Sequence, residues 1–458
     1  MSMKPFNSLP EPVHDVITIL NANAHEAFLV GGCVRDALLG RTVHDYDIAT
    51  DALPQQIMAI FSGYCRIVST GIRHGTVTLI HDGEAIEVTT YRIEQEYRDH
   101  RHPAAVSFTT DLLRDLGRRD FTINAMAMHP KLGIIDPFHG QEDLSAGIIR
   151  CVGDPARRLQ EDALRILRAV RFSCTLHFRI EALLRYAIMR NAGLLAHISA
   201  ERITKELCLI LMSEQPHILC TLRELNLLRW TFPQVLPLIR LAQPSPWHIH
   251  DVFHHTDIAL DHSRGYSLNQ KLALVFHDCG KALTRTTDAQ GHAHFKGHAQ
   301  HSAAIAETAL RQLRFPVKDI RIICTLIRFH DCRLRPDARE LRHFLAKSDA
   351  DYSFCRQLLQ IQRADDMAKN PVMVKIELAR IRAVTALLDQ LEQQRPCLTL
   401  KQLALCGDDL MKLGLRGKAI GTALDALLDH VLDQPQDNDK KTLMRLAKQR
   451  ISGSLLHS

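Results

Sequence analysis

Strand-like apolar runs and turn residues alternate over the first 150 positions, and a helical period replaces them further on. Residues 65–69, 75–80 and 85–90 have the composition of strands, with turn residues between them. From about Pro155 to the C-terminus the strand signals nearly vanish, and apolar residues recur with the 3.6-residue period of helices. The pattern therefore predicts an α/β N-terminal lobe followed by an all-α remainder.

A glycine pair joins the first predicted strand to a short helix. Phe28–Val30 has the pattern of a buried strand that ends at Gly31 and Gly32, and Val34–Leu39 has the pattern of a helix. Backbone N–H groups at such a turn approach phosphate oxygens, and the N-terminus of the helix adds positive potential. Arg35 lies in the first helical turn, where it is placed to reach the same phosphates.

Acidic residues fall on the strands that follow. Asp45 and Asp47 are two positions apart, so on a strand both carboxylates face one side. Two carboxylates beside a phosphate cradle suit a divalent metal and a nucleoside triphosphate. A glycine pair alone is commonly a turn, and an Asp-x-Asp pair alone is commonly a solvated strand edge; their succession within about twenty residues is far more specific. Glu87 lies in an apolar strand, where it either faces outward or adds a third carboxylate.

The string from Phe28 to Thr50 resembles the nucleotidyltransferase head of the class II bacterial CCA-adding enzymes and of their relatives, the bacterial poly(A) polymerases. The resemblance implies an α/β head with a polymerase-beta-like mixed sheet, followed by an all-α neck, an HD-like body and a tail. It also implies two Mg²⁺ ions held by Asp45 and Asp47, with Glu87 as the third acidic residue of the catalytic set. Residues 91–110 correspond to a flexible loop that helps CCA-adding enzymes to switch from C to A addition.

Two further motifs extend the resemblance. Arg118-Arg119-Asp120 matches a family motif that contacts the triphosphate and the ribose. Residues 161–172 have the spacing of an ordinary amphipathic helix with ion pairs. The resemblance, however, implies that Asp162 and Arg165 of this segment form an amino-acid template for the incoming base. The carboxylate accepts hydrogen bonds and the guanidinium donates them, so the two side chains can pair with C and, after they reorient, with A. The nucleotide-binding residues that the resemblance implies are Gly32, Arg35, Arg119, Asp120, Asp162, Arg165, Arg168 and Arg171. The helix expected over 200–207 matches another family helix, which we interpret as structural support.

Histidine and aspartate residues recur at wide separations in the second half of the chain, in an order that resembles an HD-type phosphohydrolase domain. The resemblance implies that His255, His277, Asp278 and Asp365 bind a divalent metal that activates water. His298 and His301, one helical turn apart, are candidate ligands for a second ion. Many nucleotidyltransferases of this group keep the HD-like fold as a helical body without hydrolysis, so the alternative of a purely structural body stays open.

Composition restricts the class of protein further. A chain of 458 residues is too long for one compact core and predicts three or four domains. The net charge of +6 is modest, but residues 150–230 carry 13 Lys and Arg against 8 Asp and Glu, which suits either an RNA backbone or a solvated helix face. Twelve cysteines scattered singly argue against a zinc ribbon or a disulfide scaffold and favour a cytoplasmic protein. There is no apolar run of the roughly 20 residues that cross a bilayer, and the N-terminus lacks an apolar signal core.

We expect four domains. They are a nucleotidyltransferase head (1–150), a helical neck that selects the nucleobase and binds RNA (151–243), an HD-type helical body (244–372) and a tRNA-binding helical tail (373–458). Residues 243–246, rich in proline, are a candidate linker. In the tail, Gly417-Lys418 opens an amphipathic helix like the one with which the family grips the tRNA elbow.

The activity that the resemblance implies is template-independent addition of C, C and A to the 3′ end of tRNA. CTP and ATP are the nucleotide substrates, two metal ions assist the transfer, and pyrophosphate is released. The expected partners are therefore tRNA, CTP and ATP, with no membrane and no obligate protein partner. One alternative is a poly(A) polymerase or a partial A-adding enzyme of the same superfamily. An alternative of another class is an HD-domain metal phosphohydrolase that acts on RNA or nucleotide phosphate ends.

Overall fold

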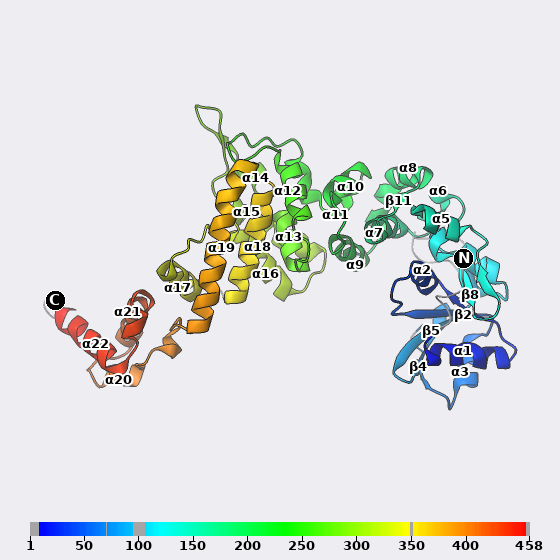
Figure 1. Cartoon of the computed structure of the whole chain (residues 1–458), viewed down its shortest axis with the longest axis horizontal. Coiled ribbons are helices and arrows are strands. Elements are labelled where there is room, and N and C mark those ends of the chain that lie inside the picture. Colours follow the sequence, from blue (N-terminus) through cyan, green and yellow to red (C-terminus); the bar gives the residue numbers. More distant parts are fainter. Residues whose placement is uncertain (1–8, 70, 95–105, 349–350, 455–458) are drawn as a thin grey trace. The chain divides into compact units, whose positions relative to one another are not determined.

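The computed structural model describes residues 9–69, 71–94, 106–348 and 351–454 (Figure 1). The chain divides into two compact units. The first comprises the chain up to Pro233 with residues 312–314, and the second comprises residues 234–311 and the chain from Phe315 onward. Most of the predicted flexible loop, residues 95–105, lies outside the described residues.

Within the described residues, a seven-stranded mixed sheet forms the centre of the N-terminal lobe, with the order β3-β4-β5-β2-β1-β8-β9 (Figure 1). The three strands predicted between residues 65 and 90 are confirmed as β3, β4 and β5. β2 and β5 run parallel, and β1 pairs antiparallel with both β2 and β8. The bounds are β1 Ala27–Val30, β2 Tyr46–Thr50, β3 Arg66–Val68, β4 Thr76–His81, β5 Glu84–Thr90, β8 Ala127–His129 and β9 Gly133–Ile135. A separate hairpin pairs β6 (Arg92–Glu94) with β7 (Val106–Phe108).

Helices pack against the sheet of the N-terminal lobe. The helices of the lobe are α1 Glu11–Ala22, α2 Gly32–Leu38, α3 Pro54–Phe61 and α4 Leu112–Gly117, and α1 and α3 pack against β1, β4 and β5. Phe28 and Val30 of β1 pack with Ala49 of β2 and with Leu116 of α4 in one buried cluster. Because side chains two apart on a strand share a face, Asp47 points to this same side of the sheet.

A helical neck completes the first unit, as predicted, except for one short parallel strand pair, β10 (Ile148–Ile149) with β11 (Arg179–Ile180). Helix α7 packs on α9, and α6 packs on α8. The single helix expected over 161–172 is wrong, because the backbone leaves the helical region at Asp162, with φ −134° and ψ 105°. The helices are α5 Gly140–Ala146, α6 Pro155–Glu161, α7 Arg165–Leu176, α8 Ala182–Asn191, α9 Ala200–Leu211, α10 Ile218–Glu224 and α11 Leu228–Thr231.

The second unit begins with a bundle in which α18 packs against α12, α13 and α16. Asp251 caps the N-terminus of α12, and Asp351 caps that of α18, so both helix starts have satisfied backbone donors. The helices are α12 Val252–Asp261, α13 Leu268–Phe276, α14 Lys281–Thr284, α15 His298–Gln312, α16 Val317–Phe329, α18 Tyr352–Met367 and α19 Pro371–Gln394. A two-residue strand pair, β12 (Thr286–Thr287) with β13 (Ala293–His294), projects between α14 and α15.

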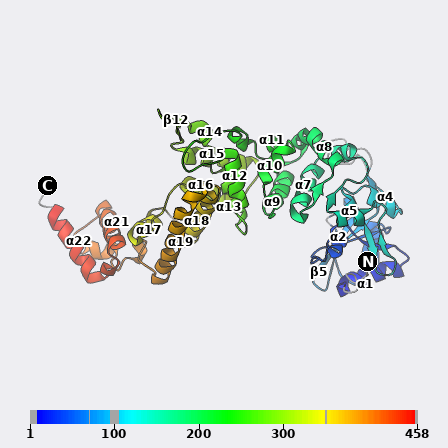
Figure 2. The same cartoon turned by 45° about the horizontal axis from the view of Figure 1, so that its top comes forward.

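The C-terminal helices have a small core of their own. Leu410, Leu427, Val431 and Leu443 are buried together where α20 (Gly407–Met411), α21 (Lys418–Asp433) and α22 (Lys440–Ser454) meet. Helix α17 (Ala338–Lys347) lies between α19 and α21 (Figure 2). Arg342 Nε donates to Leu432 O at 2.7 Å, and Arg339 Nη2 donates to Asp433 Oδ2 at 2.9 Å. These contacts attach α21 to α17.

The proline-rich segment 243–246 is not a free linker. The Gln243 side chain is buried, accepts a hydrogen bond from Lys281 Nζ at 3.0 Å and donates to His250 O at 3.2 Å. The division between the compact units falls ten residues earlier, after Pro233. In the part of the chain that the structure describes, no helix combines the length and the apolarity needed to cross a bilayer.

Replacement of Gly140 by alanine is expected to destabilise the first unit. A Cβ atom there would lie 2.3 Å from the backbone oxygen of Thr122 and 2.9 Å from Met126 Cγ, so backbone must shift. We expect a loss of about 1–3 kcal/mol in the free energy of unfolding, measured by chemical denaturation.

The matched control is Gly421→Ala, because Gly421 lies inside α21 and a Cβ atom there meets no atom within 4 Å. Alanine in this exposed helical position should raise stability by up to about 1 kcal/mol. Equal effects of the two substitutions would contradict the close packing of α5 against the Thr122 backbone.

Candidate active site

A glycine turn brings the backbone beside a carboxylate and a guanidinium. Gly31, between β1 and α2, has a φ of +77°, which favours glycine. A Cβ atom at this position would lie 3.0 Å from Arg119 Nη1 and 3.8 Å from Asp47 Oδ2. The glycine therefore keeps open the approach to two groups of opposite charge, and α2 begins directly after it at Gly32.

The structure brings together the three acidic residues predicted for the metal site. Asp47 of β2 and Glu87 of β5 are direct partners in parallel register, so their side chains share a face of the sheet. Asp45 is exposed just before β2. Burial raises the pKa of Asp47, and the charges of Glu87 and Asp45 raise it further against the effect of Arg119. This excess of negative charge is what a divalent cation compensates.

Asp115, which the sequence patterns did not single out, orients Arg119. It is buried on α4 and pairs with Arg118 (Nη2 to Oδ1, 2.8 Å) and Arg119 (Nη2 to Oδ2, 3.3 Å). Burial opposes ionisation of Asp115, but the two arginines outweigh it and lower the pKa. The spacings i,i+3 and i,i+4 from Asp115 to the arginine pair were the available sequence signal.

Asp120 is enclosed by donors of the chain itself. Its Oδ1 accepts from Phe121 N at 2.8 Å and Asn124 Nδ2 at 3.1 Å, and its Oδ2 accepts from Arg168 Nε at 2.7 Å. Burial opposes ionisation, yet Arg168 and Asn124 lower the pKa of Asp120 to about 2. A ribose hydroxyl would have to displace one of these donors, so the predicted ribose contact stays a prediction, and the geometry favours a positioning role toward Arg168.

Three predicted nucleotide-binding arginines surround one aromatic ring. The guanidinium carbons of Arg35, Arg168 and Arg171 lie 5.0, 5.4 and 4.3 Å from the ring centroid of Phe172. Burial lowers the pKa of Arg171; Glu206 opposes this shift, and Arg168 and Arg35 reinforce it. Guanidinium groups brought so close together are suited to a polyphosphate, which supplies the opposite charge and several acceptors.

The two predicted base-selecting residues lie at the junction of α6 and α7. Asp162 Oδ1 accepts from Leu164 N at 3.1 Å, and its Oδ2 accepts from Arg202 Nη2 at 2.9 Å. Arg165 is buried, and its Nη1 donates to Glu161 Oε2 at 2.8 Å while its Nη2 donates to Arg118 O at 3.0 Å. The structure therefore brings the two residues to one place and pairs each of them with a different partner.

Helix α9, expected to be support, contributes charges to this network. Arg202 pairs with Asp162, and Glu206 Oε2 lies 3.0 Å from Arg171 Nε. One nitrogen of Arg202, Nη1, is buried without a hydrogen-bond partner among the described residues. The i,i+4 spacing of Arg202 and Glu206 on one helical face was the signal that could have identified them.

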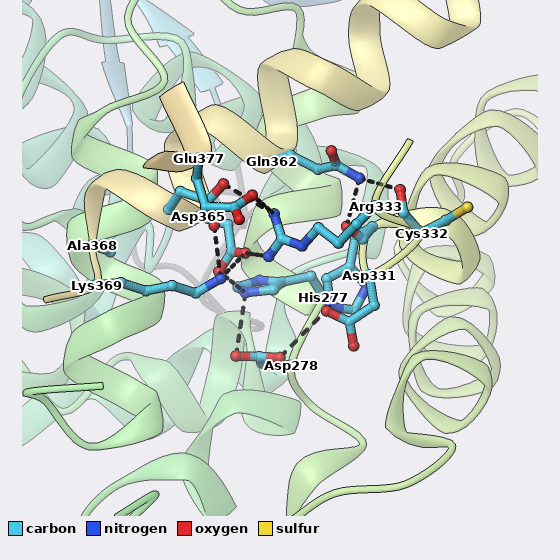
Figure 3. Close-up of polar contacts among 12 residues, drawn as sticks. His277, Asp278, Asp331, Cys332, Arg333, Gln362, Asp365, Ala368, Lys369 and Glu377 are labelled. Atoms are coloured by element: carbon cyan, nitrogen blue, oxygen red, sulfur yellow. Dashed lines mark hydrogen bonds and ion pairs between the residues drawn. The ribbon is translucent and has the colours of Figure 1, made fainter. Parts of the chain in front are cut away.

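A second cluster lies in the helical body and contains the four residues predicted for an HD-type metal site. Figure 3 shows three of them, His277, Asp278 and Asp365. His255 comes from α12, His277 and Asp278 follow α13, and Asp365 comes from α18. His255 Nε2 lies 2.8 Å from Asp365 Oδ1, and His277 Nε2 lies 3.2 Å from Asp278 Oδ2 and 3.7 Å from Asp365 Oδ1. All four side chains are buried.

The surroundings of this cluster orient its ligand atoms. His277 Nδ1 contacts Leu274 O at 2.7 Å, and His255 Nδ1 contacts Ala368 O at 3.3 Å. A carbonyl only accepts hydrogen bonds, so each Nδ1 carries a proton and Nε2 is the ring nitrogen that faces the carboxylates. Lys369 Nζ lies 2.7 Å from the other oxygen of Asp365. Although burial raises the pKa of this carboxyl, Lys369 and His255 hold it well below its usual range.

The expected pairing of His298 with His301 does not occur. His301 is exposed on α15, whereas His298 Nε2 lies 3.2 Å from Nε2 of His330, a residue at the end of α16. His330 and its neighbour Asp331 were visible in the sequence as a His-Asp pair, but nothing in their spacing connected them with His298.

Three family models match parts of the chain. Residues 27–150 match the poly A polymerase head domain, residues 177–238 match the "Probable RNA and SrmB-binding site of polymerase A", and residues 283–447 match domain 2 of tRNA nucleotidyltransferases. The match over residues 27–150 agrees with the α/β head and the mixed sheet described above.

Over part of its length, the chain is similar to bacterial CCA-adding enzymes, as the sequence resemblance predicted. It is 51% identical over 192 residues to the CCA-adding enzyme of Geobacillus thermodenitrificans and 45% identical over 216 residues to that of Limosilactobacillus reuteri. These matches cover 42% and 47% of this chain and 47% and 53% of the two relatives, so the chain spans about half the length of the curated relatives it matches.

Solved structures agree over a greater length. The CCA-adding enzyme of Bacillus stearothermophilus in complex with CTP superposes with a TM-score of 0.74 at 28% identity, over the whole of both chains. The Thermotoga maritima CCA-adding enzyme complexed with tRNA shares the fold with a TM-score of 0.58 at 19% identity, over 98% of this chain and 97% of that one.

Proposed function

We propose that this protein adds C, C and A to the 3′ end of tRNA from CTP and ATP, without a nucleic-acid template. The observation that carries this proposal is the register of Asp47 with Glu87, beside Asp45 and the Gly31 turn, in a poly(A) polymerase head domain. Similarity of the chain to CCA-adding enzymes rather than to other members of the class favours CCA over poly(A) as the product. With tRNA and nucleotides as substrates, we propose a cytoplasmic location.

The head residues would hold the metal and the nucleotide. Asp45 and Asp47 would hold two Mg²⁺ ions, with Glu87 as the third carboxylate; these acidic side chains fit hard cations, and Asp47 and Glu87 lie on one face of the sheet. Ions bound there would lower the pKa of the terminal 3′-OH and would stabilise the departing pyrophosphate. The triphosphate would be oriented beside the carboxylates by Gly32 and Arg35, which lie in the first turn of α2, and by Arg119, which lies next to Asp47.

The neck residues would position and select the nucleotide. Arg168 and Arg171, gathered with Arg35 around Phe172, would neutralise phosphate oxygens, and Asp120 would hold Arg168 in place. Asp162 would accept from the base, and Arg165 would donate to it. Because Arg165 already donates to Glu161 and to Arg118 O, the base would have to replace one of these partners, which requires a shift at the junction of α6 and α7.

The proposed domain roles follow from this assignment. The head (1–150) carries the chemistry, and the neck (151–243) selects the base and contacts RNA. The tail (373–458) grips the tRNA, with Lys418 at the N-terminus of α21 as one phosphate contact.

A second candidate function belongs to the helical body (244–372). His255, His277, Asp278 and Asp365 would bind a divalent metal, because they offer two oriented imidazole nitrogens and two carboxylates within one buried cluster. Such a metal activates water, so the body would hydrolyse phosphate ends of RNA or nucleotides. The cluster opens to a cavity of about 900 Å³ that includes Lys281, Lys296 and Arg328, which suits a phosphorylated substrate.

The first prediction concerns the carboxylates. Asp47→Asn should reduce nucleotide addition by ~10³-fold or more, equivalent to about 4 kcal/mol of transition-state stabilisation, because the metal site loses a charge. Glu87→Gln should also reduce the rate, whereas Glu84→Gln on the same strand should not, since Glu84 is three residues away and on the other face. The assay offers each nucleotide separately to tRNAs that end before, within and after CCA.

Its outcomes separate the alternatives. Addition of C, C and A and no more supports the proposal. Repeated addition of A indicates a poly(A) polymerase, addition of the terminal A alone indicates a partial enzyme, and full activity of Asp47→Asn would exclude the proposed metal site.

The second prediction concerns Arg202. Arg202→Ala should raise the KM for CTP and ATP by about tenfold and increase incorporation of UTP or GTP, because Asp162 loses the partner that orients it. Lys205→Ala removes the same charge from an exposed position of α9 and is the matched control. Unchanged nucleotide selectivity in Arg202→Ala would show that Arg202 does not position Asp162 for the base.

The third prediction tests whether the two activities are separate. His255→Ala should abolish hydrolysis of a tRNA 3′-phosphate by the Mn²⁺-loaded protein and leave CCA addition intact, because His255 lies in the second compact unit. Asp47→Asn should show the reverse. Hydrolysis that survives in His255→Ala would rule out the body as a phosphohydrolase.

A further inference from the structure

The side chain of Asn124 connects an arginine of the head with an arginine of the neck. Its Oδ1 accepts from Arg35 Nη1 at 2.8 Å, and its Nδ2 donates to Asp120 Oδ1 at 3.1 Å. The other oxygen of Asp120 accepts from Arg168 Nε at 2.7 Å. One amide group therefore holds Arg35 directly and holds Arg168 through one carboxylate.

Both neighbours require the same orientation of this amide. A guanidinium only donates hydrogen bonds, so Arg35 faces the amide oxygen, and an ionised carboxylate only accepts them, so Asp120 faces the amide nitrogen. Asparagine offers an acceptor and a donor at the end of a short side chain. Aspartate would offer acceptors on both sides and would bring a second negative charge next to Asp120, and glutamine carries the same amide on a longer side chain.

The backbone that carries this amide belongs to a packed turn. Asn124 is buried and ends the short 3₁₀ helix η3 (Thr122–Asn124), which lies against α5. Thr122 N donates to Arg150 O at 3.0 Å, and Thr122 Oγ1 donates to Asp143 Oδ2 at 2.7 Å. These contacts fix the turn within the fold of the first unit, so the amide is a rigid support for the side chains that it contacts.

The charge of Arg35 explains why a neutral acceptor suits position 124. Asp36 already faces this guanidinium with both oxygens, at 2.9 Å from Nε and 2.7 Å from Nη2. A carboxylate at position 124 would be a second negative charge on the same guanidinium and would weaken its attraction for phosphate. The amide of Asn124 holds the guanidinium without adding charge. A Cβ atom on Gly32 would lie 3.6 Å from Arg35 Nη2, so the guanidinium is held beside the glycine turn.

We propose that Asn124 is a positioning residue for the triphosphate of the incoming nucleotide, which fixes Arg35 directly and Arg168 through Asp120. The identity of this ligand rests on the proposed nucleotide addition. Because the two arginines serve the phosphates and not the base, removal of the amide should affect CTP and ATP equally. This expectation differs from the one for Arg202→Ala, which should change the selection of the base.

The positioning role can be measured as binding, without catalysis. The full-length protein is titrated by isothermal titration calorimetry, in the presence of Mg²⁺ and without tRNA, with CTP, with ATP and with inorganic tripolyphosphate. We expect Asn124→Ala to weaken the binding of each probe at least tenfold, because the two guanidinium groups are no longer held in place. In the addition assay, the KM for CTP and the KM for ATP should rise by the same factor, while kcat falls less than threefold.

An isosteric substitution separates positioning from packing. Asn124→Asp keeps the volume of the side chain, so a residue that only fills space would tolerate it. The positioning role predicts that Asn124→Asp weakens binding at least as much as Asn124→Ala, because Asp120 loses a donor and gains a negative neighbour. Since its volume is unchanged, Asn124→Asp also carries the test where Asn124→Ala does not fold.

The matched control is Asn191→Ala. Asn191 lies on α8 of the same unit, and its amide donates to Ala187 O at 2.8 Å, away from the arginines. This variant should bind all three probes as the parent protein does. Circular dichroism melts verify the fold of each variant.

The outcomes distinguish this role from the proposed function. Parent-like binding in Asn124→Asp, or a loss for CTP that tripolyphosphate does not share, overturns the positioning of the triphosphate. Unchanged binding in both variants overturns it as well. Loss of all three probes in the variants, with no nucleotide added to tRNA by the parent protein, supports the role of Asn124 and refutes the addition of C, C and A. A parent protein that binds none of the probes overturns both.

Discussion

Carboxylates packed against other charged groups are the constraint on which both sites depend. In the head, Glu87 and Asp45 raise the pKa of Asp47 against the single opposing effect of Arg119. In the body, Lys281 reaches one oxygen of Asp278 and leaves the other facing two histidines. Because a buried charge without a partner costs several kcal/mol, such arrangements are stabilised by any cation that binds them. The head carboxylates are therefore a place where a bound cation would stabilise the fold.

The head and neck sites gather charges of opposite sign, although each arginine around Phe172 has a carboxylate partner: Asp36 for Arg35, Asp120 for Arg168 and Glu206 for Arg171. The carboxylates of β2 and β5 have too little positive charge nearby, whereas the arginines around Phe172 repel one another. Asp120 connects the two regions, since it pairs with Arg168 and accepts from Asn124, which in turn accepts from Arg35. A nucleoside triphosphate with its metal ions supplies cations to the first region and phosphate oxygens to the second. Binding of the metal–nucleotide complex relieves both repulsions at once.

Local patterns were sufficient for the strands and the glycine turn, because alternation and turn residues act over a few positions. The helix break at Asp162 was not predictable from periodicity, since the apolar spacing continues through it. At the break, Asp162 accepts from Leu164 N and also pairs with Arg202, forty residues away. Arg202 and Glu206 were assigned to support for the same reason, because their partners lie on other helices.

The histidines show where spacing in the sequence misleads. The i,i+3 spacing favoured His301 as the partner of His298, but a helix places neighbours on one face without deciding which of them faces the core. His298 faces His330, 32 residues away, because α15 can approach Asp278 only where Gly280 leaves room. Gly31 has the same effect in the head, where a side chain would obstruct the space between Arg119 and Asp47. In each unit, then, a residue without a side chain determines how closely charged groups meet. We therefore regard these glycines as part of the sites themselves, although neither has a ligand atom of its own.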